Sequence, residues 1–222
     1  MIVADRKPID AIKEMLSPYK KILLVGCGTC VSVCMTGGEK EVGVLAEELR
    51  IMSKLEKKDW EITEANVQRQ CDREYIEPLE KKFKEADIVM SMACGVGIQY
   101  MAEVFPEQVV LPAINTTFYG TCVSEGEWHE RCAGCGDCVL HLTMGICPVA
   151  RCSKGLYNGP CGGTNKGKCE VSNEIDCAWY LIHKRMKEHG KLDMLGAVIP
   201  ARSWKSSLNG GPRKRIREDL KK

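Results

Sequence analysis

Hydrophobic runs and helix-like patterns alternate along the first half of the chain. The run at 21–26 is apolar after its first residue, as in a strand that is buried on both faces. The segments 60–63, 86–93 and 108–114 predict three further strands. Between the first two strands, apolar residues recur every three or four positions, which is the period of one helix face. These residues are Val42, Leu45, Leu49, Met52 and Leu55.

Two shorter helices are predicted between the later strands. One covers 77–85, where Pro78 occupies a tolerated position near the helix start, and the other covers 97–104. Strands that alternate with helices favour a parallel sheet with helices on both faces. The predicted fold class is therefore α/β, with a doubly wound parallel sheet of Rossmann or flavodoxin-like type over residues 1–120.

The pattern changes after residue 120. Nine cysteines fall between 122 and 177, among frequent glycines and without a long apolar period. Such a stretch cannot build an ordinary core, so ligand bonds must organise it. We therefore expect a small cysteine-rich, ferredoxin-like iron–sulfur domain over residues 121–200.

A last helix and a basic arm are predicted at the carboxyl end. The helix begins at residue 172 or 173 and continues to 189, with Gly190 as its stop signal. Residues 201–222 hold eight Lys or Arg residues, and we expect this arm to be solvated or to dock on a partner rather than to bind RNA. The apolar face of the helix consists of Ile175, Ala178, Trp179, Ile182 and Met186.

Composition changes this picture in one respect, the cysteine content. The chain has 222 residues, a formal net charge of +2 and 28% charged residues, which are ordinary values for a globular protein and make nucleic acid an unlikely partner. The charged amino end and the lack of a long apolar run predict a cytoplasmic protein without a membrane span. Reducing compartments keep thiols free. The 14 cysteines therefore predict metal or metal–sulfur ligation rather than disulfides.

Five cysteines follow the predicted strands. Because the carboxyl ends of parallel strands share one edge, and the second and third strands commonly flank the first, these thiols are expected to converge. Four of them could hold a [4Fe–4S] cluster, with the fifth packed beside it. A dinucleotide-binding turn at Gly26-x-Gly28 is disfavoured, since Val31 occupies the third glycine position. The five are Cys27, Cys30, Cys34, Cys71 and Cys94.

The strongest local motif is Cys132-Ala-Gly-Cys135-Gly-Asp-Cys138. Three cysteines at two-residue intervals wrap a cubic cluster in bacterial ferredoxins, where a fourth cysteine precedes a proline. Here Cys147-Pro148 follows after eight residues rather than three, so the motif leaves open whether Cys147 closes this cluster or a neighbouring one. Zinc sites prefer paired Cys-x2-Cys units, so the triple favours iron–sulfur.

Four further cysteines bring this half to eight candidate ligands, enough for two four-ligand sites. Their grouping cannot be read from spacing, and one site could instead hold structural zinc, with His141 as a weaker candidate ligand. Cys122 has no predicted partner. The four are Cys152, Cys161, Cys169 and Cys177.

The order of six segments along the chain is also informative. They include Gln70-Cys71, Ala93-Cys94-Gly95 and Asn158-Gly-Pro-Cys161-Gly-Gly163. In this order they resemble the cysteine-rich C-terminal domain family of methylenetetrahydrofolate reductase, over about residues 10–200. Within that family the chain is similar to the small subunit of the two-subunit reductase of acetogenic bacteria. The segments lie at 26–41, 70–74, 93–99, 115–118, 154–164 and 167–171.

The resemblance implies an iron–sulfur electron-transfer subunit with two or three [4Fe–4S] clusters, and zinc as an option. Electrons from ferredoxin, NADH or another input module would reach the FMN of a partner TIM-barrel subunit. That subunit would reduce 5,10-methylenetetrahydrofolate to 5-methyltetrahydrofolate in the Wood–Ljungdahl pathway. The chain itself shows no catalytic residue set, so the resemblance implies a non-catalytic subunit of an oxidoreductase complex. A structural zinc scaffold is the alternative, and a self-sufficient flavin enzyme is weaker because no flavin site is visible.

Overall fold

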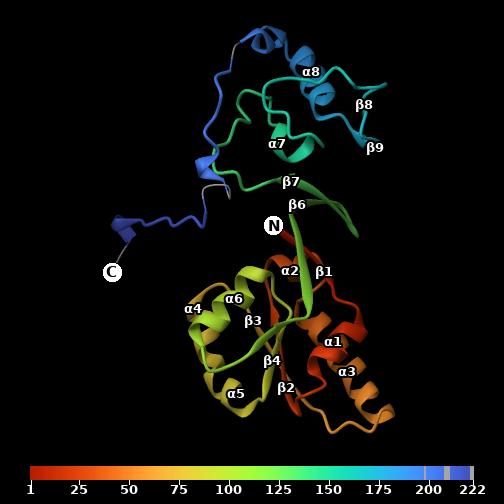
Figure 1. The fold of residues 1–222 in the computed structure, drawn as a ribbon, viewed down its shortest axis with the longest axis vertical. Coiled ribbons are helices and arrows are strands. Elements are labelled where there is room, and N and C mark those ends of the chain that lie inside the picture. The colour runs from red at the N-terminus through yellow and green to blue at the C-terminus, as the bar shows by residue number, and fades with distance from the viewer. Residues whose placement is uncertain (198, 208–210, 221–222) are drawn as a thin grey trace. The chain divides into compact units, whose positions relative to one another are not determined.

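A parallel sheet of four strands lies at the centre of the N-terminal part of the chain (Figure 1). The strands are β2 (Lys21–Cys27), β3 (Glu61–Val67), β4 (Ile88–Ser91) and β5 (Val110–Pro112), in the order β3-β2-β4-β5. All three neighbouring pairs are parallel. The predicted α/β class and parallel sheet are confirmed, and the second and third strands of this sheet flank the first.

Alternate residues of β2 supply two separate hydrophobic cores, because successive side chains of a strand point to opposite faces. Ile22 and Leu24 pack with α1 (Ile9–Leu16) and α3 (Glu39–Leu55). Leu23 and Val25 pack with Phe83, Met101 and other residues of the opposite face. The helices of this second layer are α4 (Arg73–Ile76), the 3-10 turn η1 (Glu77–Leu79), α5 (Glu80–Glu85) and α6 (Gly95–Val104).

Two helices differ in detail from the expectation. In α3 the predicted apolar face is buried as far as Leu49, but Leu55 is 78% exposed and Ser53 is buried in its place. The physical reason is the turn into β3, where Ser53 Oγ donates to the Lys58 carbonyl (2.5 Å) and accepts from Trp60 N (3.2 Å). The predicted helix over 77–85 is preceded by α4 and opens with η1, in which Pro78 sits.

An antiparallel sheet that the sequence patterns did not predict adjoins this core. Its strands are β1 (Ile2–Arg6), β6 (Ile114–Ser124) and β7 (Glu127–Cys132), in the order β1-β6-β7. Ile2 pairs with Tyr119 and Arg6 with Ile114, so the pairing joins segments that are more than a hundred residues apart. Local periodicity carries no information about such a distant partner. The short helix α2 (Cys30–Val33) lies beside this sheet in contact with β1.

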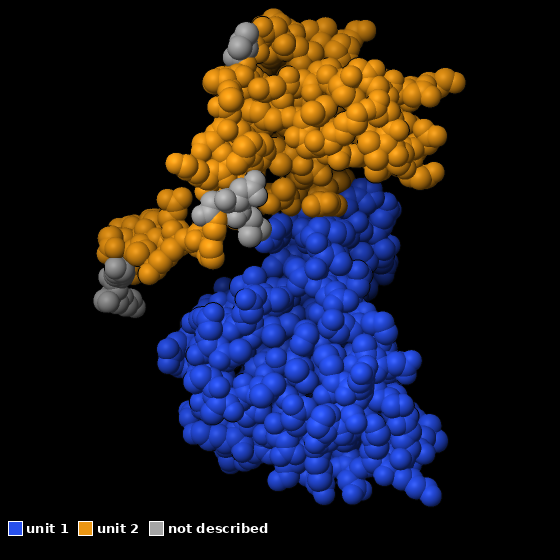
Figure 2. Space-filling view, in the orientation of Figure 1, with its two compact units in different colours: residues 1–129 blue, residues 130–222 orange. Residues whose placement is uncertain are grey.

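The structure, a computed structural model, describes residues 1–197, 199–207 and 211–220. The chain forms two compact units, Met1–His129 and Glu130–Lys222, which are coloured separately in Figure 2. The boundary falls within β7, after residue 129, whereas the composition changes near residue 120. The division into an α/β domain, a cysteine-rich domain and a basic arm stays a prediction.

The second unit has short elements and a small core. Its elements are α7 (Pro148–Arg151), the hairpin strands β8 (Lys168–Cys169) and β9 (Ser172–Asp176), α8 (Ala178–Glu188), and the 3-10 turns η2 (Leu192–Gly196), η3 (Trp204–Ser206) and η5 (Glu218–Leu220). The buried cluster consists of Ile146, Trp179, Ile182 and Met186. Trp179 Nε1 donates to the Leu156 carbonyl at 2.8 Å, which ties the helix to the preceding loop.

The start of the last helix was predicted wrongly. Residues 172–176 form β9 instead, and Ile175 is 40% exposed rather than part of the buried face. Residues 172–176 form a strand rather than a helix because they pair with Lys168–Cys169 in an antiparallel hairpin, in which Lys168 pairs with Asp176. The rest of the predicted face is buried on α8, and Gly190 ends the helix region with a positive φ of 64°. A ferredoxin-like character of this unit stays a prediction.

In the part of the chain that the structure describes, no helix has both the length and the apolar character needed to cross a membrane.

A buried glutamine connects the carboxyl ends of β2 and β4. The Gln70 amide donates to the carbonyls of Val25 (2.9 Å) and Gly26 (3.0 Å) and accepts from Ser91 Oγ at 2.6 Å. Its side chain is fully buried. These bonds occupy both ends of the amide, because a buried polar group without a partner is costly.

We expect Gln70→Leu to lower the free energy of unfolding by about 1–3 kcal/mol, since Ser91 and the β2 carbonyls lose their partner. Urea unfolding followed by circular dichroism measures this change. The matched control is Gln68→Leu at an exposed position two residues earlier, which should change stability by less than about 0.5 kcal/mol. Equal effects of the two substitutions would show that the Gln70 bonds do not stabilise the sheet edge.

Candidate functional site

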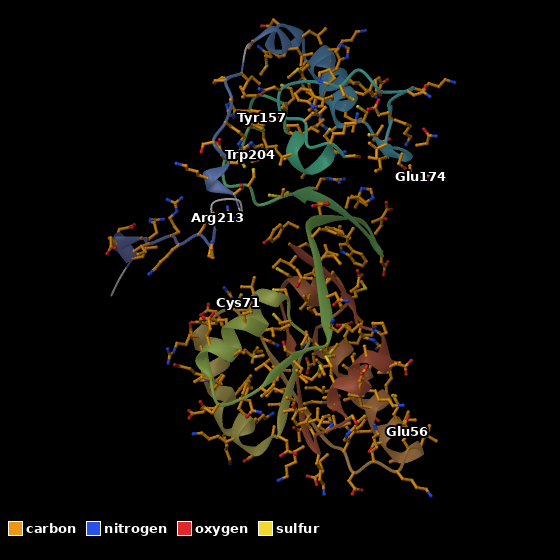
Figure 3. All side chains as sticks on the ribbon, in the orientation of Figure 1. Glu56, Cys71, Tyr157, Glu174, Trp204 and Arg213 are labelled. Atoms are coloured by element: carbon orange, nitrogen blue, oxygen red, sulfur yellow. The ribbon has the colours of Figure 1, made fainter. Side chains whose placement is uncertain are left out.

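Three of the five N-terminal cysteines lie together at the carboxyl edge of the parallel sheet. Cys27 ends β2, Cys71 follows β3, and Cys94 follows β4 as the residue that precedes α6. Partial burial and then the nearby Cys27 and Cys94 raise the pKa of the Cys71 thiol. Cys71, labelled in Figure 3, is exposed, whereas Cys27 and Cys94 are buried. The expected convergence is therefore observed for these three thiols.

The other two N-terminal cysteines differ from each other. Cys30 begins α2, three residues after Cys27, and is half-buried. Cys34 is buried, and its sulfur lies 3.6 Å from the Val31 carbonyl and 3.5 Å from Thr36 Oγ1. Thr36 Oγ1 in turn donates to the Ala4 carbonyl of β1 at 2.8 Å. The contacts of Cys34 are thus those of a packed core thiol.

The backbone around this edge leaves little room for side chains. A Cβ at Gly37 would overlap the Met92 carbonyl at the end of β4. Gly95 N, at the start of α6, donates to Thr116 Oγ1 of β6 at 2.8 Å. Sequence reasoning missed Gln70 and Thr116 as supports of this edge. The position of Gln70 next to Cys71 could have indicated its role. Thr116 could not have been found in this way, because it lies on β6, which the sequence patterns did not predict.

All four of the last cysteines line one cavity in the second unit. Its volume is about 320 Å³. The thiols come from separate segments: the end of α7, the loop before β8, β8 itself and the residue before α8. Arg151, Lys154 and His183 also line the cavity, as do the acidic Glu170 and Asp176. The four cysteines are Cys152, Cys161, Cys169 and Cys177.

Hydrogen-bond donors contact the sulfurs of two of these cysteines. Gly163 N donates to Cys161 Sγ at 3.4 Å. The backbone amide of Val171, and then the Ser153 hydroxyl, lower the pKa of the Cys169 thiol. A bond to the charged form lowers a thiol pKa, and thiolate is the form that binds metals. Glu170, beside Cys161, is held by an ion pair with Lys154.

The cysteine triple forms a tight loop at the end of β7. Gly134 and Gly136 flank Cys135 with positive φ angles of 61° and 84°, which only glycine adopts freely. Gly134 N donates to Cys132 Sγ at 3.3 Å, so this loop repeats the amide-to-sulfur contact seen at Cys161. Cys147 is the residue before α7 and is half-buried.

Part of the C-terminal arm, which was expected to be solvated or to dock on a partner, packs on this loop of its own chain. Arg213 Nη1 donates to the Gly134 carbonyl at 2.8 Å, and Ser206 Oγ donates to the Cys135 carbonyl at 3.0 Å. The Arg202 guanidinium reaches Cys135 Sγ. Composition alone could not show this, because loop carbonyls that accept from arginine leave no pattern in the sequence. The end of the arm, at 214–220, is exposed.

Within residues 1–197, 199–207 and 211–220, no three His, Cys, Asp or Glu side chains form a group that could hold a metal ion directly. The ligand sets therefore stay predictions. His141 is exposed, and Cys122 is exposed on β6 with its sulfur 2.9 Å from the Ser124 carbonyl. Neither residue lines the four-cysteine cavity.

The comparison with protein families agrees with the sequence motifs. Residues 111–205 match the family described as "Methylene-tetrahydrofolate reductase C terminal". The match includes the cysteine triple and the four-cysteine cavity. No curated protein and no solved structure matches the chain. The resemblance to this family is thus confirmed over these residues, and it links the chain to methylenetetrahydrofolate reductase.

We expect the thiols of Cys169 and Cys71 to react with iodoacetamide over different pH ranges in the chelated, metal-free chain. The thiolate is the nucleophile, so the rate at Cys169 should rise below the ordinary thiol pKa of 9.0 and that at Cys71 above it. Mass spectrometry of the labelled peptides against pH measures both rates, and the urea-unfolded chain is the control. Superimposable profiles in the folded chain would contradict the hydrogen bonds at Cys169.

Proposed function

We propose that the chain is an iron–sulfur electron-transfer subunit that works with a methylenetetrahydrofolate reductase. The observation that carries the proposal is the cavity shared by Cys152, Cys161, Cys169 and Cys177. Buried apolar cores do not require four thiols from four segments around one space. Four thiolates are the ligand set of a [4Fe–4S] cluster.

The size of the cavity favours a cluster over a single zinc ion. Zinc binds thiolates at about 2.3 Å in a tetrahedron, which brings its sulfurs to about 3.8 Å from one another. A cavity of about 320 Å³ between the thiols leaves room for a polynuclear group instead.

We propose three ligand sets. The cavity cysteines form the first, and the triple Cys132, Cys135 and Cys138 forms the second, with Cys147 as the candidate fourth ligand. At the sheet edge we assign Cys27, Cys30, Cys71 and Cys94, and we assign Cys34 to packing because its sulfur faces Thr36. Bound clusters supply one-electron transfer.

The residues around the cavity have separate tasks in this proposal. The amides of Gly163 and Val171 stabilise negative charge on Cys161 and Cys169. The buried Trp179 ring lines the cavity and excludes water from one side. Arg151 and Lys154 provide positive charge next to an anionic group.

The catalytic flavin is proposed to lie on a partner subunit, which this chain supplies with electrons from ferredoxin or an NADH-oxidising module. The family match supports the association with methylenetetrahydrofolate reductase. The FMN and the folate substrate belong to the partner in this scheme, and the clusters of this chain form the path toward it.

Metal and sulfide analysis of the anaerobically purified chain tests the proposal. We expect iron and acid-labile sulfide in nearly equal amounts, in steps of about four per chain, and a brown colour that dithionite bleaches. Zinc without sulfide in a colourless protein would contradict electron transfer and would favour a structural zinc scaffold.

We expect Cys161→Ala to remove about four irons per chain, since the cavity cluster loses one of four ligands. Cys122→Ala is the matched control, because Cys122 is an exposed thiol outside the proposed sets, and it should keep the full iron content. Iron and sulfide content of both variants, with circular dichroism to confirm folding, gives the answer. A folded Cys161→Ala protein with full iron would exclude this ligand assignment.

A further inference from the structure

A buried arginine is packed against the cysteine triple. The Arg202 side chain is only 4% exposed. Its guanidinium lies 5.2 Å from the centre of the Tyr157 ring and 4.5 Å from that of Trp204. The two rings meet edge to face at 6.4 Å, and both are labelled in Figure 3. A charge that is removed from water in this way is costly unless an opposite charge compensates it.

The neighbours of Arg202 compensate this charge only in part. Nη1 and Nη2 lie 3.8 and 3.7 Å from Cys135 Sγ. Nη2 also lies 3.6 Å from Asp137 Oδ2, but that carboxylate is 60% exposed, so solvent screens the pair. Nε is buried and has no hydrogen-bond partner among the described residues. The main acceptor near the guanidinium is therefore the sulfur of the half-buried Cys135.

A protonated thiol is a weak acceptor, whereas a thiolate bound to iron carries the negative charge that a buried guanidinium needs. We propose that Arg202 is a positioning residue for the iron–sulfur cluster of the cysteine triple, and that it raises the reduction potential of this cluster. This inference rests on the proposed function. A reduced cluster carries one more negative charge than an oxidised one, so a cation at a ligand sulfur stabilises the reduced form more strongly.

The same contact connects the cluster to the C-terminal strap, which we define as residues 199–207 and 211–213. Asn158 Nδ2 donates to the Ile199 carbonyl at 3.2 Å, and Arg213 Nη1 joins the Ser206 carbonyl (2.6 Å) to the loop. A Cβ at Gly136 would lie 2.5 Å from the Ser206 carbonyl, so strap and loop backbones are in direct contact. Cluster binding and strap docking should therefore stabilise each other.

Redox titration of the anaerobically purified, full-length chain tests the role of Arg202. In Arg202→Gln we expect iron and sulfide to remain, while the potential of one cluster falls. At a fixed solution potential, the ratio of reduced to oxidised cluster should drop about tenfold, which corresponds to 59 mV for a one-electron couple. Arg202→Lys keeps the charge and should recover part of the shift. Arg215→Gln, at an exposed position of the same arm, should leave every potential unchanged.

Each other outcome has a defined meaning. A wild-type chain without iron and sulfide overturns the proposed function and this inference together. Full iron with an unchanged potential in Arg202→Gln overturns only the role of Arg202. If Arg202→Gln loses iron, the Arg202→Lys protein decides. Retained iron with a potential at or slightly below that of the wild type supports the role of the positive charge, whereas loss of iron in Arg202→Lys as well, although the charge is kept, overturns it.

Limited proteolysis of the wild-type chain provides a readout that does not depend on the variants. Trypsin should cut after Arg202 and Arg213 slowly in the iron-loaded protein and at least tenfold faster after chelation, because the strap loses its anionic anchor. Cleavage after the exposed Lys81, in the first unit, is the internal control. Equal protection of the strap before and after chelation would overturn the coupling.

Discussion

The described part of the second unit has a small buried apolar core, and the rest of its architecture follows from this constraint. Among the described residues of this unit, the hydrophobic cluster comprises four buried residues. Chains with so small a core need disulfides, metals or partners to become stable. Four thiols line a cavity in this unit, and glycines with positive φ allow the chain to turn near them. This cavity is the main feature of this part besides its small core.

The first unit differs from the second in having larger apolar cores. It has two apolar cores, one on each face of β2. The parallel sheet fixes where the strand ends lie, and it brings Cys27, Cys71 and Cys94 to one edge. A polar side chain, Gln70, holds the ends of β2 and β4 together beneath these thiols.

Charge gives the two cysteine sites of the second unit a common feature. Backbone amides donate to sulfur at Cys132 and Cys161, and cationic side chains lie beside the thiols, as Arg202 does at Cys135. Arg202 is the most demanding of them, because its guanidinium is buried between two aromatic rings and is only partly compensated by protein groups. The family match over residues 111–205 covers both sites and most of the strap.

The sequence by itself determined the α/β class, the parallel sheet and the grouping of the cysteines into an N-terminal and a C-terminal set. These features depend on local periodicity and on the rule that parallel strands end at one edge, and both can be read from neighbouring residues. Tertiary structure alone decided the β1-β6 pairing, the strand at 172–176 and the packing of Arg202 on Cys135. Each of these joins segments whose partners lie elsewhere in the chain. Such contacts depend on which groups meet in three dimensions, so they produce no periodic pattern in the sequence.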